Sequence, residues 1–180
     1  MMRNDQQRWG MVSVWLHWLS ALAVIGLFAL GLWMVELTYY DDWYKEAPDI
    51  HRSIGVLLFI ATVLRLLWRW SNPKPAPLAS HSRLEKIAAG AAHVVLYLML
   101  FAIMISGYLI STADGLAVDV FNLFSVPATL QGIEHQEDIA GVFHYWLAVS
   151  LIALVVLHAL AAIKHHFIDR DATLKRMLGR

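Results

Sequence analysis

The sequence predicts an all-α membrane protein, a bundle of four transmembrane helices with both termini on the cytoplasmic side. Three observations support this fold class. Hydrophobic residues make up 59% of the 180-residue chain, and the mean hydropathy of +0.55 is too high for an ordinary soluble domain. Four apolar runs are each long enough to cross a hydrocarbon layer about 30 Å thick. The polar segments between these runs separate into a basic set and an acidic set.

The first apolar run is expected to be a retained membrane span. Trp15 and Trp18 lie near its start and Trp33 near its end, as is typical of a helix anchored at both membrane interfaces. The run is longer than the core of a signal peptide, and no small-residue cleavage site follows it. The four predicted spans together form one transmembrane domain over residues 1–180, and they cover about residues 11–35, 50–70, 84–110 and 139–167.

The connecting segments have three different characters. Pro48 ends a polar loop and suits the first turn of the second span. Residues 71–83 contain three prolines and are expected to form a short extended connector. The longest connection contains the apolar stretch 118–127, which is too short to cross the bilayer and is expected to lie on the membrane surface.

The distribution of Lys and Arg predicts the orientation. Twelve of the fourteen basic residues lie in the N-terminal segment, in or beside the second connection, or in the C-terminal tail; only Lys45 and Arg52 lie elsewhere. The other two connections and their edges hold ten of the fourteen carboxylates. By the positive-inside rule, both termini are cytoplasmic. We therefore expect a multi-pass protein of the cytoplasmic (inner) membrane that contacts lipid and no nucleic acid.

Histidines inside the spans form two layers. His51 and His144 lie near the outer face, whereas His17 and His158 lie near the inner face, where His93 is a competing partner for His158. Two imidazoles on facing helices at equal depth suit the two axial positions of a haem iron, which favours electron transfer over oxygen binding. The absence of cysteine excludes covalent haem attachment and thiolate-bound clusters, so such a haem is b-type. Zinc would need three or four clustered ligands, and no embedded carboxylate joins these pairs.

These motifs resemble the bacterial cytochrome b561 family, which is related to the cytochrome b subunits of nickel hydrogenases and includes a superoxide oxidase. The resemblance covers nearly the whole chain and is carried by His17-Trp18, His51, the RLLWR segment 65–69, the KPAP turn 74–77, His93, His144, His158 and the pair His165-His166. It implies two haems b held by His17 with His158 and by His51 with His144. It also implies electron transfer between a periplasmic donor and ubiquinone or a similar quinone.

Other polar residues have weaker assignments. His93 is a candidate contact for a haem propionate or a quinone, and a hydrogen-bonded core histidine is an equally good interpretation. Arg65 and Arg69 are candidate propionate partners or snorkelling anchors, and Arg52 is a possible propionate or quinone contact. His165 lies seven positions after His158 and so on nearly the same helix face, where the resemblance suggests a quinone contact; for Lys164 we prefer an interfacial role. Small residues within the spans permit close approach of helices or of a macrocycle, namely Gly26, Gly31, Gly55, Gly90 and Gly107.

The sequence thus predicts a transmembrane cytochrome that carries single electrons between a periplasmic-side donor and membrane quinone. The alternatives are a superoxide oxidase that reduces ubiquinone, a haem-bearing anchor subunit of a periplasmic dehydrogenase or hydrogenase, and a metal-ion carrier. Ten carboxylates against Lys45 and Arg52 in the outer segments favour a cationic donor, or a protein with a basic docking face, over superoxide.

Overall fold

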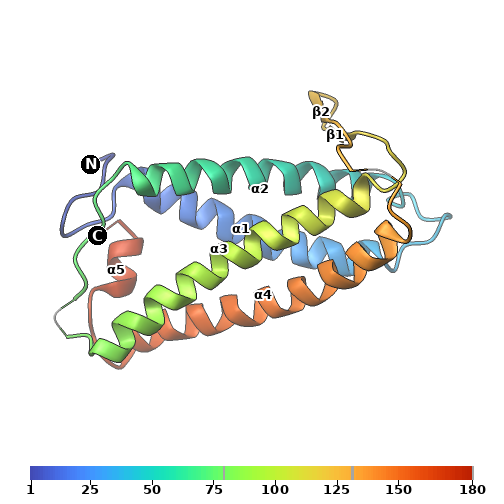
Figure 1. The fold of residues 1–180 in the computed structure, drawn as a ribbon. Helices are drawn as coiled ribbons and strands as arrows, with labels where there is room; N and C mark the ends of the chain where they lie inside the picture. The colour runs from blue at the N-terminus through green and yellow to red at the C-terminus, as the bar shows by residue number, and fades with distance from the viewer. Residues whose placement is uncertain (79, 131, 180) are drawn as a thin grey trace. The chain divides into compact units, whose positions relative to one another are not determined.

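Four long helices account for most of this computed structural model, which describes residues 1–78, 80–130 and 132–179 (Figure 1). The helices are α1 (Met11–Met34), α2 (Glu46–Trp70), α3 (Arg83–Ser111) and α4 (Gln136–Phe167). Each is long and apolar enough to cross a membrane. The predicted all-α fold with four candidate membrane spans is therefore confirmed.

The helix ends differ from the predicted spans mainly at two N-termini. Helices α2 and α4 begin before the expected residues 50 and 139, because polar first turns precede their apolar runs. Glu46 and Asp49 lie in the first turn of α2, and Glu137 and Asp138 lie in that of α4. Carboxylates there interact favourably with the positive end of the helix dipole. Hydropathy alone therefore underestimates the length of both helices.

Three short elements, two strands and one helix, were not predicted. In the longest connection, β1 (Val118–Val120) pairs antiparallel with β2 (Phe124–Val126). The turn between them places Phe121 and Asn122 at φ 49° and 57°, the left-handed backbone that tight hairpin turns require. The stretch expected on the membrane surface is thus a small hairpin. The tail contains the five-residue helix α5 (Thr173–Met177).

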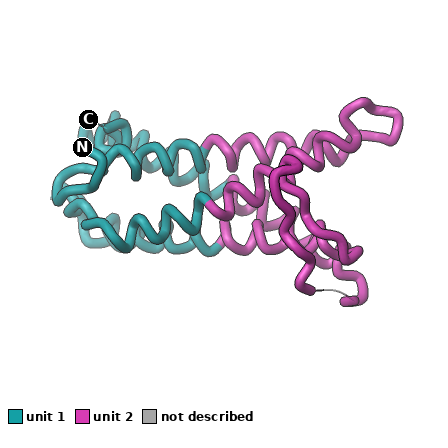
Figure 2. Tube along the Cα trace, turned by 90° about the horizontal axis from the view of Figure 1, so that it is seen from above, with its two compact units in different colours: residues 1–21, 61–98, 153–180 teal, residues 22–60, 99–152 magenta. Residues whose placement is uncertain are grey.

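Contacts within the chain define two compact units, which Figure 2 colours separately. Unit 1 contains Met1–Ala21, Ala61–Leu98 and Ala153–Arg180, and unit 2 contains Leu22–Ile60 and Met99–Ile152. Each long helix contributes one part to each unit. The basic and acidic connecting segments fall into different units. The basic termini and connector 71–82 belong to unit 1, and the two acidic connections belong to unit 2.

Hydrogen bonds join the three basic segments of unit 1 to one another. The amide of Ala76 donates to the carbonyl of Gln6 at 2.8 Å, and Arg176 donates to the carbonyl of Ala76 at 2.8 Å. Trp18 of α1 donates its indole N–H to the carbonyl of Met177 at 2.7 Å. The N-terminal segment, the proline-rich connector and the tail therefore form one polar assembly.

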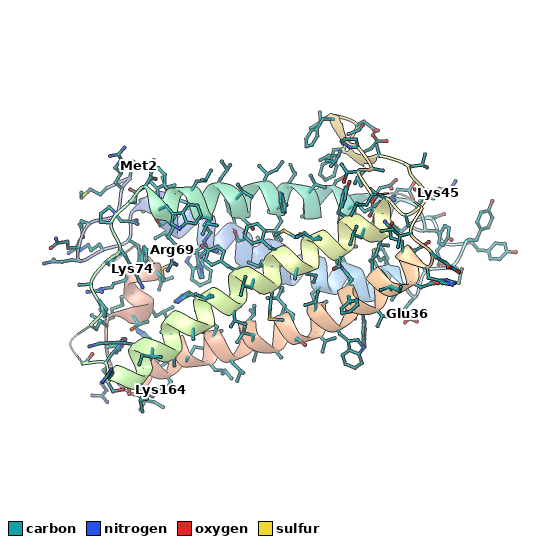
Figure 3. The ribbon with its side chains drawn as sticks, in the orientation of Figure 1. Met2, Glu36, Lys45, Arg69, Lys74 and Lys164 are labelled. Atoms are coloured by element: carbon teal, nitrogen blue, oxygen red, sulfur yellow. The ribbon has the colours of Figure 1, made fainter. Side chains whose placement is uncertain are left out.

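Large apolar side chains point outward along the long helices (Figure 3). Leu22, Leu98 and Trp146 illustrate this, with 70%, 64% and 62% of their surfaces exposed. Soluble proteins rarely expose extended apolar surface of this kind, whereas a lipid-facing helix requires it. The exposure pattern therefore agrees with a membrane environment. Charged residues labelled in Figure 3 include Arg69, Lys74 and Lys164 of unit 1 and Glu36 and Lys45 of unit 2.

Candidate functional site

In each unit, two histidines from different helices lie with their ring centroids about 6 Å apart. In the unit 1 pair, His17 of α1 and His158 of α4 have ring centroids 6.3 Å apart and ring planes at 61°. In the unit 2 pair, His51 of α2 and His144 of α4 have centroids 6.1 Å apart and planes at 67°. These are the two pairs that the sequence analysis expected, and α4 supplies one member of each.

The ring separations match a metal ion bound between two imidazoles. A metal–nitrogen bond to histidine is about 2.0 Å long, and a five-membered ring with bonds of about 1.35 Å places each nitrogen ~1.1 Å from the centroid. The metal–nitrogen and nitrogen–centroid distances add to about 3.1 Å for each ring, so two rings on opposite sides of one ion have centroids about 6.2 Å apart. Both pairs, at 6.3 Å and 6.1 Å, lie at this value.

A third imidazole lies next to the unit 1 pair. The ring centroid of His93 on α3 is 5.4 Å from that of His158, which is shorter than the separation that two trans ligands need. Its Nδ1 lies 2.7 Å from the carbonyl of Ala89 and donates to it, since a carbonyl only accepts. The hydrogen on Nδ1 leaves the lone pair of Nε2 free. His93 is therefore suited to bind a metal by its tautomer but not by its distance from His158.

Arg65 gives His17 the opposite tautomer. A guanidinium nitrogen of Arg65 lies 2.9 Å from Nδ1 of His17, and because arginine only donates, this Nδ1 is an acceptor and the ring hydrogen is on Nε2. Coordination through Nε2 therefore requires Arg65 to turn to another acceptor. A carboxylate such as a haem propionate is a stronger acceptor for arginine than a neutral imidazole. Arg65 and Arg69 also lie over the ring of Tyr97, at 5.6 Å and 5.9 Å from its centroid.

The surroundings of His144 in unit 2 prepare it as a ligand. Its Nδ1 lies 3.0 Å from the carbonyl of Ile103 and 3.1 Å from the hydroxyl of Ser106. The carbonyl can only accept, so Nδ1 carries the hydrogen and Nε2 keeps a free lone pair. A hydrogen bond from the second ring nitrogen to a carbonyl fixes the orientation of many metal-binding histidines. Sequence reasoning missed Ser106, although a polar residue within an apolar run was a visible signal.

Two glycines pack directly against the unit 2 pair. A Cβ added at Gly31 would lie 3.3 Å from Cε1 of His51, and one at Gly107 would lie 3.1 Å from Cε1 of His144. Nδ1 of His51 is buried and has no hydrogen-bond partner, an arrangement that a bound group explains. The expectation that span glycines permit close approach thus applies at these two positions. A Cβ would meet nothing within 4 Å at Gly26, Gly55 and Gly90.

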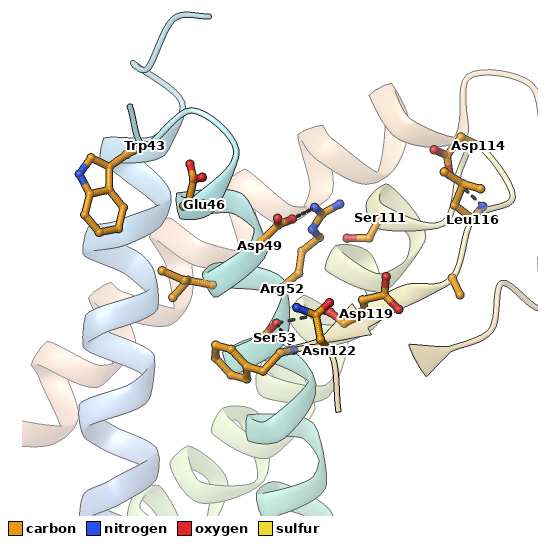
Figure 4. A pocket seen from close by; sticks show the side chains of 13 residues that line it. Trp43, Glu46, Asp49, Arg52, Ser53, Ser111, Asp114, Leu116, Asp119 and Asn122 are labelled. Atoms are coloured by element: carbon orange, nitrogen blue, oxygen red, sulfur yellow. Dashed lines mark hydrogen bonds and ion pairs between the residues drawn. The ribbon is translucent and has the colours of Figure 1, made fainter. Parts of the chain in front are cut away.

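A pocket of about 470 Å³ lies in unit 2, lined by the first turns of α2, the end of α3 and the segment that leads into the hairpin (Figure 4). Ile50, Arg52 and Ser53, the sequence neighbours of His51, contribute to its wall, and Arg52 forms an ion pair with Asp49. The pocket therefore contains four carboxylates and one guanidinium, and that guanidinium is already paired. The carboxylates belong to Glu46, Asp49, Asp114 and Asp119.

The remaining predicted site residues lie among carboxylates in unit 1. Lys164 forms ion pairs with Asp169 at 2.7 Å and with Glu85 at 3.2 Å. Nδ1 of His165 lies 2.7 Å from Asp169 and 3.3 Å from Asp171. Burial raises the pKa of Asp171, but hydrogen bonds, first among them that from the amide of Thr173, leave this pKa below its ordinary value. Lys164 is therefore paired, whereas Nδ1 of His165 lies near two carboxylates but makes no hydrogen bond.

Comparison with known proteins assigns the chain to a family. The family model for prokaryotic cytochrome b561 matches residues 8–180. Cytochrome b561 homolog 2 of Escherichia coli K12 is 57% identical over 98% of this chain and 94% of that protein. A probable superoxide oxidase of Yersinia pestis is 29% identical over 97% of both chains, and cytochrome b561 homolog 1 of Escherichia coli K12 is 24% identical over 96% of this chain and 98% of its own. The chain therefore belongs to the prokaryotic cytochrome b561 family of haem-binding membrane proteins that transport electrons.

Proposed function

We propose that this chain carries single electrons across the membrane, between a donor on the periplasmic side and quinone near the cytoplasmic side. Two haems b are held by the unit 1 pair, His17 with His158, and by the unit 2 pair, His51 with His144. The observation that carries this proposal is the ring separation of 6.3 Å and 6.1 Å, which suits one iron between each pair. A haem iron with imidazole on both faces exchanges one electron and has no open position for oxygen.

The neighbouring residues orient the ligands and balance charge. Ser106 and the carbonyl of Ile103 keep the hydrogen of His144 on Nδ1, so that the lone pair of Nε2 would be free to hold the iron. Arg65 and Arg69 supply two positive charges in unit 1, which suit the carboxylates of haem propionates. The apolar spans keep water away from both pairs.

The proposed orientation places both termini in the cytoplasm and the protein in the inner membrane. The N-terminal segment, the connector and the tail are basic, and they are joined by hydrogen bonds within unit 1. The connections of unit 2 carry the acidic residues. This agrees with the positive-inside rule. We accordingly treat residues 1–180 as one transmembrane domain and assign the quinone to the side of the basic segments.

The proposed quinone contacts are His165 and His93 in unit 1. His165 follows His158 by two helical turns on α4, and 15% of its side chain is exposed. An imidazole N–H can donate to a quinone carbonyl, so a quinone that reaches this ring would lie on the same helix face as a haem ligand. His93 is the second candidate because its ring packs against that of His158.

Superoxide is the second candidate donor. Its support is the relative named a probable superoxide oxidase, which is 29% identical to this chain. The charges of the unit 2 pocket disfavour it, because four carboxylates face one arginine that already pairs with Asp49. A negative surface potential slows the capture of an anion and speeds the capture of a cation. We therefore propose a cationic small molecule, or a protein with a basic docking face, as the donor.

Haem analysis of histidine variants tests the proposal. We expect about two haems per chain in the purified protein, and about one after His51→Ala or His144→Ala, because each haem loses one of its two axial ligands. His17→Ala and His158→Ala should remove the other haem, and a redox titration should then show one step instead of two. His135→Ala is the matched control, since His135 is 68% exposed in a connection.

Two results would contradict this assignment. If His93→Ala empties the unit 1 site while His17→Ala leaves it filled, then His93 is the axial partner of His158. If the purified protein is stable and colourless, the haem function itself fails. A retained count of two haems in all four variants would show that other residues hold the iron.

A further inference from the structure

We propose that His81, His165 and Asp171 form a binding site for one divalent transition-metal ion of the zinc class. The three residues come from the connector before α3, the last turn of α4 and the tail, and all three belong to unit 1. One donor atom of each lies within 4.8 Å of the donor atoms of the others. The site is separate from the four proposed haem ligands and does not depend on them.

Two of the three separations between the donor atoms are close to those around one tetrahedral ion. Oδ2 of Asp171 is 2.7 Å from Nε2 of His81 and 3.3 Å from Nδ1 of His165. Ligand atoms about 2.0 Å from a tetrahedral zinc ion are roughly 3.3 Å from one another. His165 and Asp171 already have this separation, and His81 needs to move by only about half an ångström. The imidazoles of His81 and His165 face each other, with ring centroids 4.6 Å apart.

The three side chains are mostly buried and partly fixed in place. His81, His165 and Asp171 are 16%, 15% and 6% exposed. The amide of Thr173 donates to Oδ1 of Asp171 at 2.7 Å, which leaves Oδ2 directed at the two histidines. A hydrogen bond to the second oxygen of a carboxylate is a common outer-sphere support for a metal ligand.

Nδ1 of His165 is the atom that most clearly lacks a suitable partner. It is buried and makes no hydrogen bond of acceptable geometry, although Asp169 and Asp171 lie 2.7 Å and 3.3 Å away. If the ring is neutral with its hydrogen on Nε2, the Nδ1 lone pair faces carboxylate oxygens and is repelled. A cation bound at Nδ1 relieves this repulsion.

The charges around the cluster favour a divalent ion. Glu85, Asp169 and Asp171 contribute three negative charges, and Lys164 contributes one positive charge through its ion pairs with Glu85 and Asp169. Among the residues that the structure describes, no Lys or Arg forms an ion pair with Asp171. With both imidazoles neutral, as metal binding requires, these four groups carry a net charge of minus two, which one divalent ion neutralises. Imidazole with carboxylate is a ligand set that zinc accepts, and three protein ligands leave a fourth position for water.

Metal binding at Nδ1 would also fix the tautomer of His165. The hydrogen then has to be on Nε2, and this nitrogen can donate to a quinone carbonyl. This consequence rests on the proposed function, whereas the metal site itself does not. Zinc would thus connect the tail to the end of α4 and orient the proposed quinone contact.

Zinc binding to the haem-containing protein tests the site. The purified protein is stripped with a chelator, dialysed against buffered zinc, and analysed for zinc and iron together. We expect about one zinc per chain, and X-ray absorption at the zinc edge should show nitrogen and oxygen ligands at about 2.0 Å. His81→Ala and Asp171→Asn should weaken zinc binding by more than tenfold, because loss of an outer-sphere partner alone costs about 10- to 100-fold. His135→Ala, an exposed histidine beside Glu134 and Asp138, should bind zinc like the wild type.

The iron content separates failure of the site from failure of the fold. Variants that keep their iron but lose zinc support the proposal, and Asp171→Asn preserves the shape of the side chain if His81→Ala fails to fold. Wild-type protein without bound zinc would overturn the proposal, and so would equal zinc binding by wild type and both variants. If zinc binds as expected but His165→Ala leaves the quinone kinetics unchanged, the metal site stands and the quinone contact fails.

Discussion

A single methyl group at Gly107 should weaken the haem held by the unit 2 pair. In Gly107→Ala the new Cβ would lie 3.1 Å from Cε1 and 3.4 Å from Nδ1 of His144. Carbon atoms in comfortable contact are about 3.5 to 4.0 Å apart, so the imidazole has to move by at least ~0.4 Å. That movement also disturbs the bonds of Nδ1 to Ile103 and Ser106, which are 3.0 Å and 3.1 Å long.

The size of the effect follows from the cost of overpacking. Extra methyl groups in a packed interior cost about 1 to 3 kcal/mol, and 1.4 kcal/mol corresponds to a factor of ten. We therefore expect the haem between His51 and His144 to be retained about 5- to 150-fold less tightly. The haem between His17 and His158 should be unaffected, because Gly107 belongs to unit 2. Gly31→Ala should have a smaller effect, since its Cβ would lie 3.3 Å from His51.

Transfer of haem to excess apomyoglobin measures this retention. About half of the haem should leave Gly107→Ala faster than it leaves the wild type. Gly26→Ala is the matched control, because it makes the same change in a helix of unit 2 and its Cβ would meet nothing within 4 Å. Both variants gain the same helix propensity, about 1 kcal/mol, so any difference between them comes from the contact. Equal transfer rates and unchanged redox steps in both variants would refute the reasoning.

Three further predictions concern the donor, the quinone and the tail. Reduction of the protein by superoxide should be slow and should become faster as salt rises, because salt screens the acidic pocket; a near-diffusion-limited rate that falls with salt would show attractive steering instead. His165→Ala should keep both haems and slow their oxidation by quinone in stopped-flow measurements, and an unchanged rate would remove His165 from the quinone site. The pKa of Asp171 is lowered from 3.8, so this carboxylate stabilises the tail above its unfolded pKa, and the stability is lost as pH falls through the folded value. The protection of the Thr173 amide against hydrogen exchange, measured relative to its intrinsic rate at each pH, should therefore fall in acid in the wild type, and Asp171→Asn should show no such dependence.

The sequence predicted the helices well because lipid imposes one strong rule, an apolar run of sufficient length. The expected span 11–35 corresponds to Met11–Met34 and the span 84–110 to Arg83–Ser111. Hydropathy gives no information on polar structure outside the spans. The hairpin of β1 and β2 depends on backbone conformations at Phe121 and Asn122, and a Phe at positive φ is not a turn signal that sequence patterns reveal.

The sequence also singled out the histidines within the spans, because ionisable groups there are unusual. It left His17 and His93 open as partners of His158, and the family resemblance favoured His17. It did not reveal what supports them. The contacts of His144 with Ile103 and Ser106 depend on the rotation of α3 against α4, and so does the packing of Gly107. The sequence did not predict the cluster of His81, His165 and Asp171 either. These residues are distant along the chain and come together only when the tail folds back within unit 1.

Two structural observations, the histidine tautomers and the ring separations, point to different partners of His158, namely His93 and His17. The tautomers favour His93, whose Nδ1 donates to Ala89, over His17, whose Nδ1 accepts from Arg65. The ring separations favour His17, at 6.3 Å from His158 against 5.4 Å for His93. A tautomer changes when one proton and one flexible arginine move, and a new propionate partner for Arg65 compensates for the lost hydrogen bond. A ring separation that is about 0.8 Å too short changes only if a histidine takes another rotamer, which for His93 breaks its hydrogen bond to Ala89, or if a helix moves within a packed unit, which is costly. The distance is therefore the better guide, and His17 is the expected ligand.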